Sequence, residues 1–403
     1  AAEFKEVVLR EAKIGGQIDM TGSKFNGKLD MASLEVESHL FMRGAAEFKE
    51  VVLREAKIGG QIDMTGSKFT GTLVMDSLEV ESSLFMRDSA EFADIILFGA
   101  KVMGDLQMYT SKFTGELDMT LLQVGDNLDM KNAEIINSSP IRLAFAKIGG
   151  NLDLSGSTFK SFDLIGTRIS REFRLSSKKT VDMPDIGDAE WDGVSKLTLH
   201  NTKVGVLQDS KESWPDNIEL DGFTYDRLGK FFIFKDGGSV EATRDFKWLK
   251  EWLGKQKDYS PQPYEYLASV LQKSGLEGMA KDILYTSRER KRSEVVTGLN
   301  WCGLTILKYA IGYGYRIYYS ILWIIFFIIA GMFCVWRNKE GRERGIIWSL
   351  FYSLDIILPI IRLDERHYEI ELNGFAKYYF YFHIVIGFVL ASFVIAGISG
   401  LTQ

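Results

Sequence analysis

The chain has 403 residues and a formal net charge of −6, and a chain of this length predicts two or more structural units. Residues 1–132 contain 14 Lys and Arg against 22 Asp and Glu, a balance of −8 that argues against a nucleic-acid-binding surface there. The two cysteines, Cys302 and Cys334, have no CxxC spacing, so the sequence predicts neither a disulfide framework nor a zinc site.

Repeats dominate the N-terminal third of the chain. Residues 1–44 recur nearly unchanged at 45–88 and more divergently at 89–132, and each block contains a finer, 11-residue period. One apolar series begins at Leu9 and Met20 and continues with this period to Met130. A second apolar residue stands two positions before each member, beginning with Val7 and Ile18. This spacing places both side chains on one side of a strand, which favours a β-solenoid.

The period also predicts the shape of the coil. We expect each 11-residue unit to form two short faces of the coil. Two units then form one rectangular coil of four faces and 22 residues, with an interior ladder of Ile, Leu, Met and Phe. In every fourth unit the large residue shifts by one position, to Phe4, Phe48 and Phe92. We interpret this shift as a bulge that makes the full period 44. Coiled coils can also have an 11-residue period, but the internal glycines and the paired apolar residues favour the solenoid.

The pattern resembles the pentapeptide-repeat family, whose Ala-x-Leu-x-x units form a right-handed quadrilateral β-helix. The resemblance covers residues 1–175 and weakens through residues 152–154, 162–164 and 173–175. It implies a four-sided, right-handed coil, although each unit here has one residue more than two pentapeptides. Some members are acidic mimics of DNA. Outer faces that alternate Lys and Glu are instead typical of a solvated surface, and we favour that interpretation.

Beyond the repeats, the sequence predicts an irregular cap over residues 176–240 and a helical linker over residues 241–298. The segment after Ser260 and Pro261 resembles a tetratricopeptide-type helix pair, and it is similar to the segment before the membrane part of a group of bacterial β-helix membrane proteins. We interpret it as a spacer. A basic cluster then predicts contacts with anionic lipid headgroups. It consists of Arg288, Arg290, Lys291 and Arg292.

Residues 299–403 predict a membrane domain with spans at about 317–336 and 378–400. Between them, residues 346–361 are too short to cross and predict an amphipathic half-helix, which dips into the bilayer or lies on its surface. The polar face of this segment is a candidate pore lining and comprises Ser349, Tyr352, Ser353, Asp355 and Pro359. The acidic residues that follow form a vestibule in a channel, or a solvated loop otherwise. They are Asp364, Glu365, Glu369 and Glu371.

Two spans around a half-helix are typical of two-span channels, which must oligomerise to enclose a path. We therefore expect a homo-oligomeric ion channel or pore-forming effector that the solenoid gates or assembles. The alternative is a membrane-anchored scaffold that recruits protein partners to the solenoid without transport. The sequence has no dinucleotide, redox or nucleophile motif, and its four histidines lie far apart. We expect no enzyme activity and no catalytic, cofactor or metal site.

The expected location is the cytoplasmic (inner) membrane of a bacterium, with the solenoid in the cytoplasm. Lys and Arg number seven in residues 281–316 and seven in residues 337–378, so the positive-inside count does not decide the orientation. The tight basic cluster before the first span and the lack of a visible export signal favour a cytoplasmic solenoid. The chain opens within a repeat and without Met, so the lack of a signal carries little weight.

Overall fold

The computed structural model describes residues 3–136, 139–177, 187–235, 238–358, 363–370 and 372–398. The chain forms two compact units, and the boundary falls between Gly275 and Leu276. Unit 1 contains a parallel β-solenoid of about 10 turns over residues 3–232, followed by the helices α1 (Phe246–Gly254) and α2 (Gln262–Lys273). Unit 2 is α-helical.

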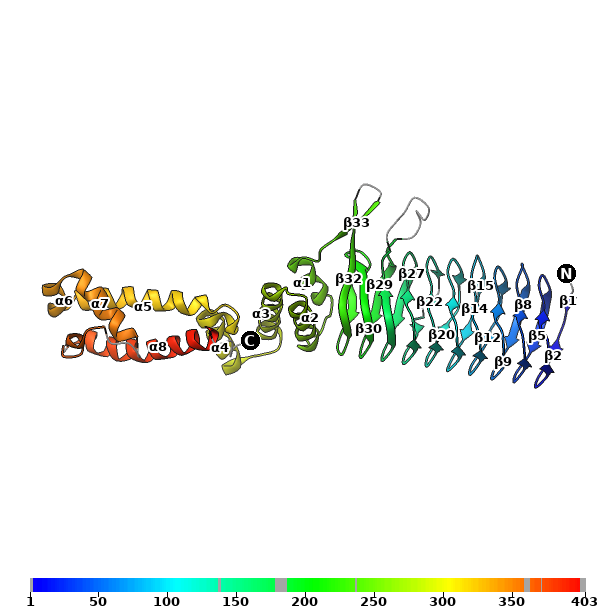
Figure 1. Cartoon of the computed structure of the whole chain (residues 1–403), viewed down its shortest axis with the longest axis horizontal. Coiled ribbons are helices and arrows are strands. Elements are labelled where there is room, and N and C mark those ends of the chain that lie inside the picture. The colour runs from blue at the N-terminus through cyan, green and yellow to red at the C-terminus, as the bar shows by residue number, and fades with distance from the viewer. Residues whose placement is uncertain are drawn as a thin grey trace. The chain divides into compact units, whose positions relative to one another are not determined.

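The solenoid winds in turns of about 22 residues, and its strands stack in parallel on those of the next turn (Figure 1). They form two sheets, whose pairings are parallel apart from that of the last strand of the second sheet, which lies beyond the solenoid and pairs antiparallel. The first sheet comprises β1 (Glu3–Phe4), β2 (Val7–Val8), β5 (Lys24–Asp30), β8 (Glu47–Val52), β11 (Lys68–Phe69), β12 (Leu73–Val74), β15 (Glu91–Phe92), β16 (Ile95–Ile96), β19 (Lys112–Phe113), β20 (Leu117–Asp118), β23 (Glu134–Ile135), β24 (Ile141–Arg142), β27 (Thr158–Asp163), β29 (Glu190–Thr198) and β31 (Asn217–Glu219). The second comprises β3 (Lys13–Ile14), β4 (Ile18–Asp19), β6 (Glu35–Val36), β7 (Leu40–Phe41), β9 (Lys57–Ile58), β10 (Ile62–Asp63), β13 (Glu79–Val80), β14 (Leu84–Phe85), β17 (Lys101–Val102), β18 (Leu106–Gln107), β21 (Gln123–Val124), β22 (Leu128–Asp129), β25 (Lys147–Ile148), β26 (Leu152–Asp153), β28 (Arg168–Arg174), β30 (Lys203–Ser210), β32 (Thr224–Lys235) and β33 (Gly238–Ala242).

The shift of the large aromatic residue produces a register irregularity, as the sequence predicts. Phe25 pairs with Phe4 on one strand and with Phe48 on the other. Fewer residues therefore separate Phe4 from Phe25 than separate Phe25 from Phe48. The β5–β8 register shifts between Phe25 and Lys28. The alternation of short and long steps places the aromatic rings in one column, with neighbouring centroids 4.7–5.5 Å apart. The column consists of Phe4, Phe25, Phe48, Phe69, Phe92 and Phe113.

A left-handed backbone conformation ends each 11-residue unit. A residue with positive φ stands at every multiple of 11 from Glu11 to Asn132. Such a residue turns the chain from one face to the next, and glycine adopts this conformation at the least cost. Eight of these twelve positions are not glycine, for example Glu55 and Leu121. The periodic turn is therefore hard to see in the sequence, whereas the buried Met and Leu ladder between the turns is plain.

The coils extend further than the repeat pattern indicates. The sequence predicts an irregular cap over residues 176–240, whereas β29, β30, β31 and β32 continue the parallel stacking to residue 232. Three of these strands, β29, β30 and β32, are longer than any earlier strand, and three of the pairings contain a register shift, which obscures the 11-residue period. The helices α1 and α2 then cover the last coil. Gln256 and Gln262 accept hydrogen bonds from the backbone N–H groups of Leu220 and Gly222.

Unit 2 contains two helices that are long and apolar enough to cross a membrane, α5 (Tyr318–Trp336) and α8 (Phe375–Ile398). The helices α3 (Glu277–Glu294) and α4 (Gly298–Ile311) and the turn η1 (Gly312–Gly314) precede α5. The helices α6 (Lys339–Arg344) and α7 (Ile346–Ile357) and the turn η2 (Glu365–His367) lie between α5 and α8 in the chain. In unit 2, α7 packs against both α5 and α8 (Figure 1).

Glycines allow close packing of these helices. A Cβ atom on Gly331 of α5 would lie 2.2 Å from Oγ of Ser353 in α7, and one on Gly387 of α8 would lie 2.3 Å from the carbonyl oxygen of Ile357. Small residues allow this close approach in membrane helices as well. Within the apolar stretch of each helix, only 17% of α5 and 22% of α8 is buried inside the protein. The large exposed apolar surface suits a lipid environment.

Candidate functional site

The predicted polar face of α7 points into unit 2. Ser349, Ser353 and Asp355 have no exposed surface, and Tyr352 is buried as well. The opposite face is exposed, with Ile347 70% accessible. The structure therefore buries four of the five predicted pore-lining residues within unit 2. Pro359, the fifth, lies outside the described residues.

Asp355 organises the segment that follows α7. Its carboxylate accepts hydrogen bonds from the backbone N–H groups of Leu363 at 2.7 Å and Asp364 at 3.2 Å, and it contacts Nδ1 of His367 at 2.8 Å. The hydroxyl of Tyr368 donates to the backbone carbonyl of Asp355 at 3.3 Å. A buried carboxylate is costly unless it is satisfied in this way. Sequence reasoning missed His367, because its partner stands far back along the chain, in the preceding helix.

A second polar contact joins α5, α7 and α8. The Ser353 hydroxyl donates to the carbonyl oxygen of Ile328 at 2.9 Å, and Nε2 of His383 lies 3.1 Å from the carbonyl oxygen of Ser353. His383 is fully buried, and its Nδ1 has no hydrogen-bond partner among the described residues. An ionisable group at this depth in a spanning helix is a candidate functional group. The sequence shows His383 inside a span but does not show its partner.

The structure describes three of the four residues of the candidate acidic vestibule. Asp364 accepts a hydrogen bond from the backbone N–H of Arg366 at 3.0 Å and so caps η2. Glu365 and Glu369 are exposed. Glu371 lies outside the described residues. Among the described residues, no three His, Cys, Asp or Glu side chains gather as metal ligands.

The predicted basic cluster on α3 divides into two kinds of residue. Arg290 forms an ion pair with Glu294, and Arg292 forms one with Glu289. Arg288 and Lys291 form no ion pair with a described residue. Glu289 also binds Lys308 of α4 at 2.6 Å. Partial burial of Glu289 acts to raise its pKa, but the hydrogen bonds from Lys308, Tyr313 and Arg292 outweigh this effect and lower it.

A further candidate site lies on the outer surface of the solenoid. One column of outward residues runs through Lys13, Glu35, Lys57, Glu79 and Lys101, so its charges alternate from coil to coil. The ion pair between Lys13 and Glu35 measures 2.8 Å, and that between Lys101 and Glu79 also measures 2.8 Å. The contact with Glu79 raises the pKa of Lys101. Opposite charges on adjacent strands stabilise the stack.

The same column changes character in the later coils. After Gln123 it continues through Lys147, Arg168 and Lys203, three consecutive cations on adjacent strands. None of the three forms an ion pair with a described residue. Like charges directly opposite each other repel, so this part of the column has an uncompensated positive potential.

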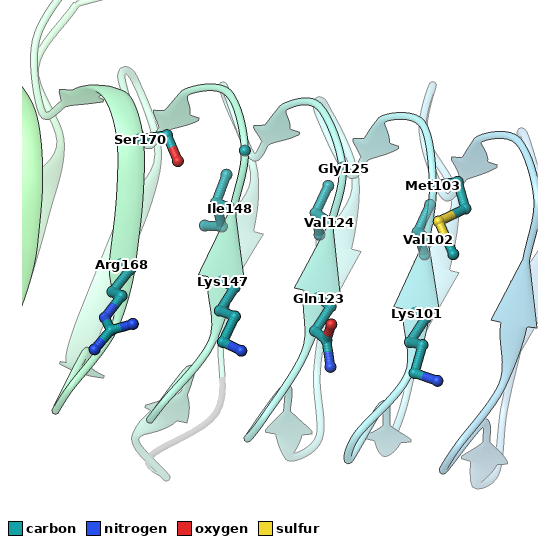
Figure 2. A pocket seen from close by; sticks show the side chains of 11 residues that line it. Lys101, Val102, Met103, Gln123, Val124, Gly125, Lys147, Ile148, Arg168 and Ser170 are labelled. Atoms are coloured by element: carbon teal, nitrogen blue, oxygen red, sulfur yellow. The ribbon is translucent and has the colours of Figure 1, made fainter.

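A groove of about 320 Å³ lies along this part of the column. Lys101, Gln123, Lys147 and Arg168 form one side, and Met103 and Ser170 lie at the other (Figure 2). Gly125 and Gly149 lie between these two residues, and no carboxylate lines the groove. A Cβ atom on Gly149 would lie 2.0 Å from the carbonyl oxygen of Gly125, so the coils approach too closely there for a side chain. We call this site the basic groove.

Comparisons with protein-family models, with curated proteins and with solved structures give no match to this chain.

Proposed function

We propose that the protein is a membrane-anchored scaffold whose solenoid binds an acidic segment of a partner protein in the basic groove. The observation that carries the proposal is the change of one column from alternating charges to Lys147, Arg168 and Lys203 in succession. The earlier part of this column pairs each Lys with a Glu on an adjacent strand, whereas the groove residues include no carboxylate. Binding of an external anion would compensate the repulsion among these three cations.

The surroundings of the groove favour a short peptide as the partner. Adjacent strands lie about 4.8 Å apart, so Lys101 to Arg168 spans about 14 Å over three steps. The earlier coils are acidic, because residues 1–132 have a balance of −8. A nucleic acid or a flat anionic bilayer along the solenoid would meet this negative surface, whereas a peptide of a few acidic residues fits within the groove.

Anchoring rests on α5 and α8. Both are long enough to cross about 30 Å of hydrocarbon, and most of their apolar surface is not covered by the protein. We place the chain in the bacterial cytoplasmic membrane with the solenoid in the cytoplasm, as the similarity to a group of bacterial β-helix membrane proteins and the basic cluster before the first span suggest. The resemblance to pentapeptide-repeat proteins also implies a right-handed coil.

Binding of a fluorescent hexaglutamate peptide to the full-length protein in detergent tests the scaffold proposal. We expect Lys147→Glu with Arg168→Glu to weaken binding at least tenfold, and we expect added salt to weaken binding to the unmodified protein. Lys13→Glu with Lys57→Glu is the matched control, because it makes the same two charge reversals in the same column, outside the groove. Equal loss of binding in the control, or no binding by the unmodified protein, contradicts the proposal.

A second candidate function is ion conduction by a homo-oligomer. It is favoured by the buried ionisable groups Asp355, His367 and His383, which lie around α7 in an apolar bundle. Because the polar face of α7 points into the protomer, conduction requires α7 to rotate or to repack during assembly. Purified protein in liposomes should then pass ions, and His383→Ala should change the flux. The absence of flux at every oligomeric state contradicts this function.

A further inference from the structure

A cavity of about 380 Å³ lies in unit 2 between α7, η2 and the first half of α8. Its floor is built from buried side chains, namely Tyr352, Ile356, His367, Leu372 and Phe380. Its rim is exposed and includes Lys377, Tyr381 and Ile384. The cavity is therefore open on the side where α8 presents its apolar surface.

The lining changes from polar to apolar along α8. Lys377 stands in the first turn of α8, and Phe380, Tyr381 and Ile384 follow on the same face. Ile384 lies about 10 Å further along the helix axis than Lys377, because the rise is about 1.5 Å per residue. If α8 crosses a bilayer, Lys377 stands at the water boundary and Ile384 stands within the hydrocarbon. The cavity thus extends from the headgroup region into the acyl region.

The polar end of the cavity is positively charged. Lys377 lies at the N-terminus of a helix, where the helix dipole disfavours a cation, and the first turn of α8 has no acidic residue. Lys377 forms no ion pair with a described residue. Asn373 and the buried His367, whose Nδ1 is held by Asp355, add hydrogen-bonding groups to the lining. An anion at this end would compensate both the lysine and the helix dipole.

We infer that this cavity binds an anionic glycerophospholipid, with the phosphate beside Lys377 and Asn373 and the upper part of an acyl chain against Ile356, Phe380 and Ile384. A soluble phosphate ester satisfies the charged end alone, whereas a lipid fills both ends. The inference rests on the membrane anchoring of the proposed function but not on the basic groove.

Native mass spectrometry of the full-length protein, released from detergent in the presence of added lipid, measures this binding. We expect phosphatidylglycerol to bind more tightly than phosphatidylcholine, and we expect glycerol phosphate at equal phosphate concentration to bind much more weakly than phosphatidylglycerol. Lys377→Gln should reduce the affinity for phosphatidylglycerol at least fivefold, and Ile384→Ala should reduce it about threefold, since less apolar surface is covered. Lys339→Gln is the matched control, because Lys339 is an exposed lysine at the start of α6 and does not line the cavity.

Equal binding of the two lipids, equal effects of Lys377→Gln and Lys339→Gln, or glycerol phosphate binding as tightly as phosphatidylglycerol overturns the inference. Hexaglutamate binding measured on the same sample is independent of these outcomes. Failure of the lipid site and failure of the scaffold proposal are therefore distinguishable.

Discussion

Replacement of Asp355 by Asn tests whether this carboxylate stabilises unit 2 from within. The side chain has no exposed surface, and it receives two backbone hydrogen bonds and a contact from His367 at 2.8 Å. Asn retains one acceptor, but its amide group then faces hydrogen-bond donors. A hydrogen bond to a charged group contributes about 1.5–3 kcal/mol, so we expect a loss of about 3 kcal/mol in the free energy of unfolding of unit 2.

Asp364→Asn is the matched control for this experiment. Asp364 is the neighbouring carboxylate and caps η2 through the backbone N–H of Arg366. Asn is as good a cap as Asp, so this change should cost less than about 0.5 kcal/mol. Denaturant unfolding of the full-length protein in detergent, with hydrogen exchange to follow residues 363–370, measures both variants. Equal and small effects of the two substitutions would refute the internal role of Asp355. The scaffold proposal predicts that Asp355→Asn leaves hexaglutamate binding unchanged.

Three further predictions concern the remaining parts of the chain. Phe69 stacks on Phe48 and on Phe92, so Phe69→Leu should destabilise the solenoid by about 1–3 kcal/mol in urea unfolding. Phe4→Leu is the control: it removes a single stack at an exposed ring and should destabilise the solenoid by less than about 1 kcal/mol. Leu121 has a φ of 60° and is exposed, so Leu121→Gly should stabilise the solenoid by about 0.5–1 kcal/mol in the same assay, and a loss of stability contradicts the strain argument. Because the pKa of Glu289 is lowered, its stabilisation is complete above the usual Glu value of about 4.3 and is lost as the pH falls through the lowered pKa. The protection factors of α4 against hydrogen exchange, corrected for the intrinsic exchange rate at each pH, should therefore fall in acid, and Glu289→Gln should remove that dependence.

Local periodicity predicts the solenoid well, because each interior position recurs in every 11-residue unit and each coil repeats its neighbour. The displaced Phe48 even predicts the irregular register of β8. Prediction fails after residue 175, where the coils continue but the strands lengthen and take extra residues. The nine-residue strand β29, for example, pairs with β27 through a register shift between Phe159 and Ser161. Parallel stacking tolerates such insertions, whereas a fixed period does not reveal them.

The candidate site in unit 2 shows a different limit. Helical periodicity identifies Ser349, Ser353 and Asp355 as members of one face, and the structure buries all three. Ser353 contacts α5 and α8, whereas Asp355 contacts the segment that follows α7. The periodicity does not say what covers that face. The partners His367 and His383 stand 12 and 30 residues away from Asp355 and Ser353, in elements whose packing depends on the whole bundle. A polar face between two spans is therefore compatible both with a pore lining and with contacts inside the protomer. The sequence favours the pore lining, because it does not show that His367 and His383 contact this face.

The charge columns explain why the solenoid repeats over two coils and why the basic groove stands out. Outward residues of adjacent coils lie about 4.8 Å apart, so identical charges in every coil would repel along the whole column. Two columns avoid this by alternation: Lys13 to Lys101 in the second sheet, and Lys24, Glu47, Lys68 and Glu91 in the first. Alternation requires a two-coil repeat, and the Phe column has the same period. The compensation ends within the groove, so the positive potential there is a local property of Lys147 and Arg168, with Lys203 next in the column, on a solenoid whose earlier coils are acidic. Arg168→Glu restores alternation, because it places a carboxylate between Lys147 and Lys203. This substitution should therefore lower the repulsion in the free solenoid while it weakens the binding of an acidic peptide, and a purely structural column would show the first effect without the second.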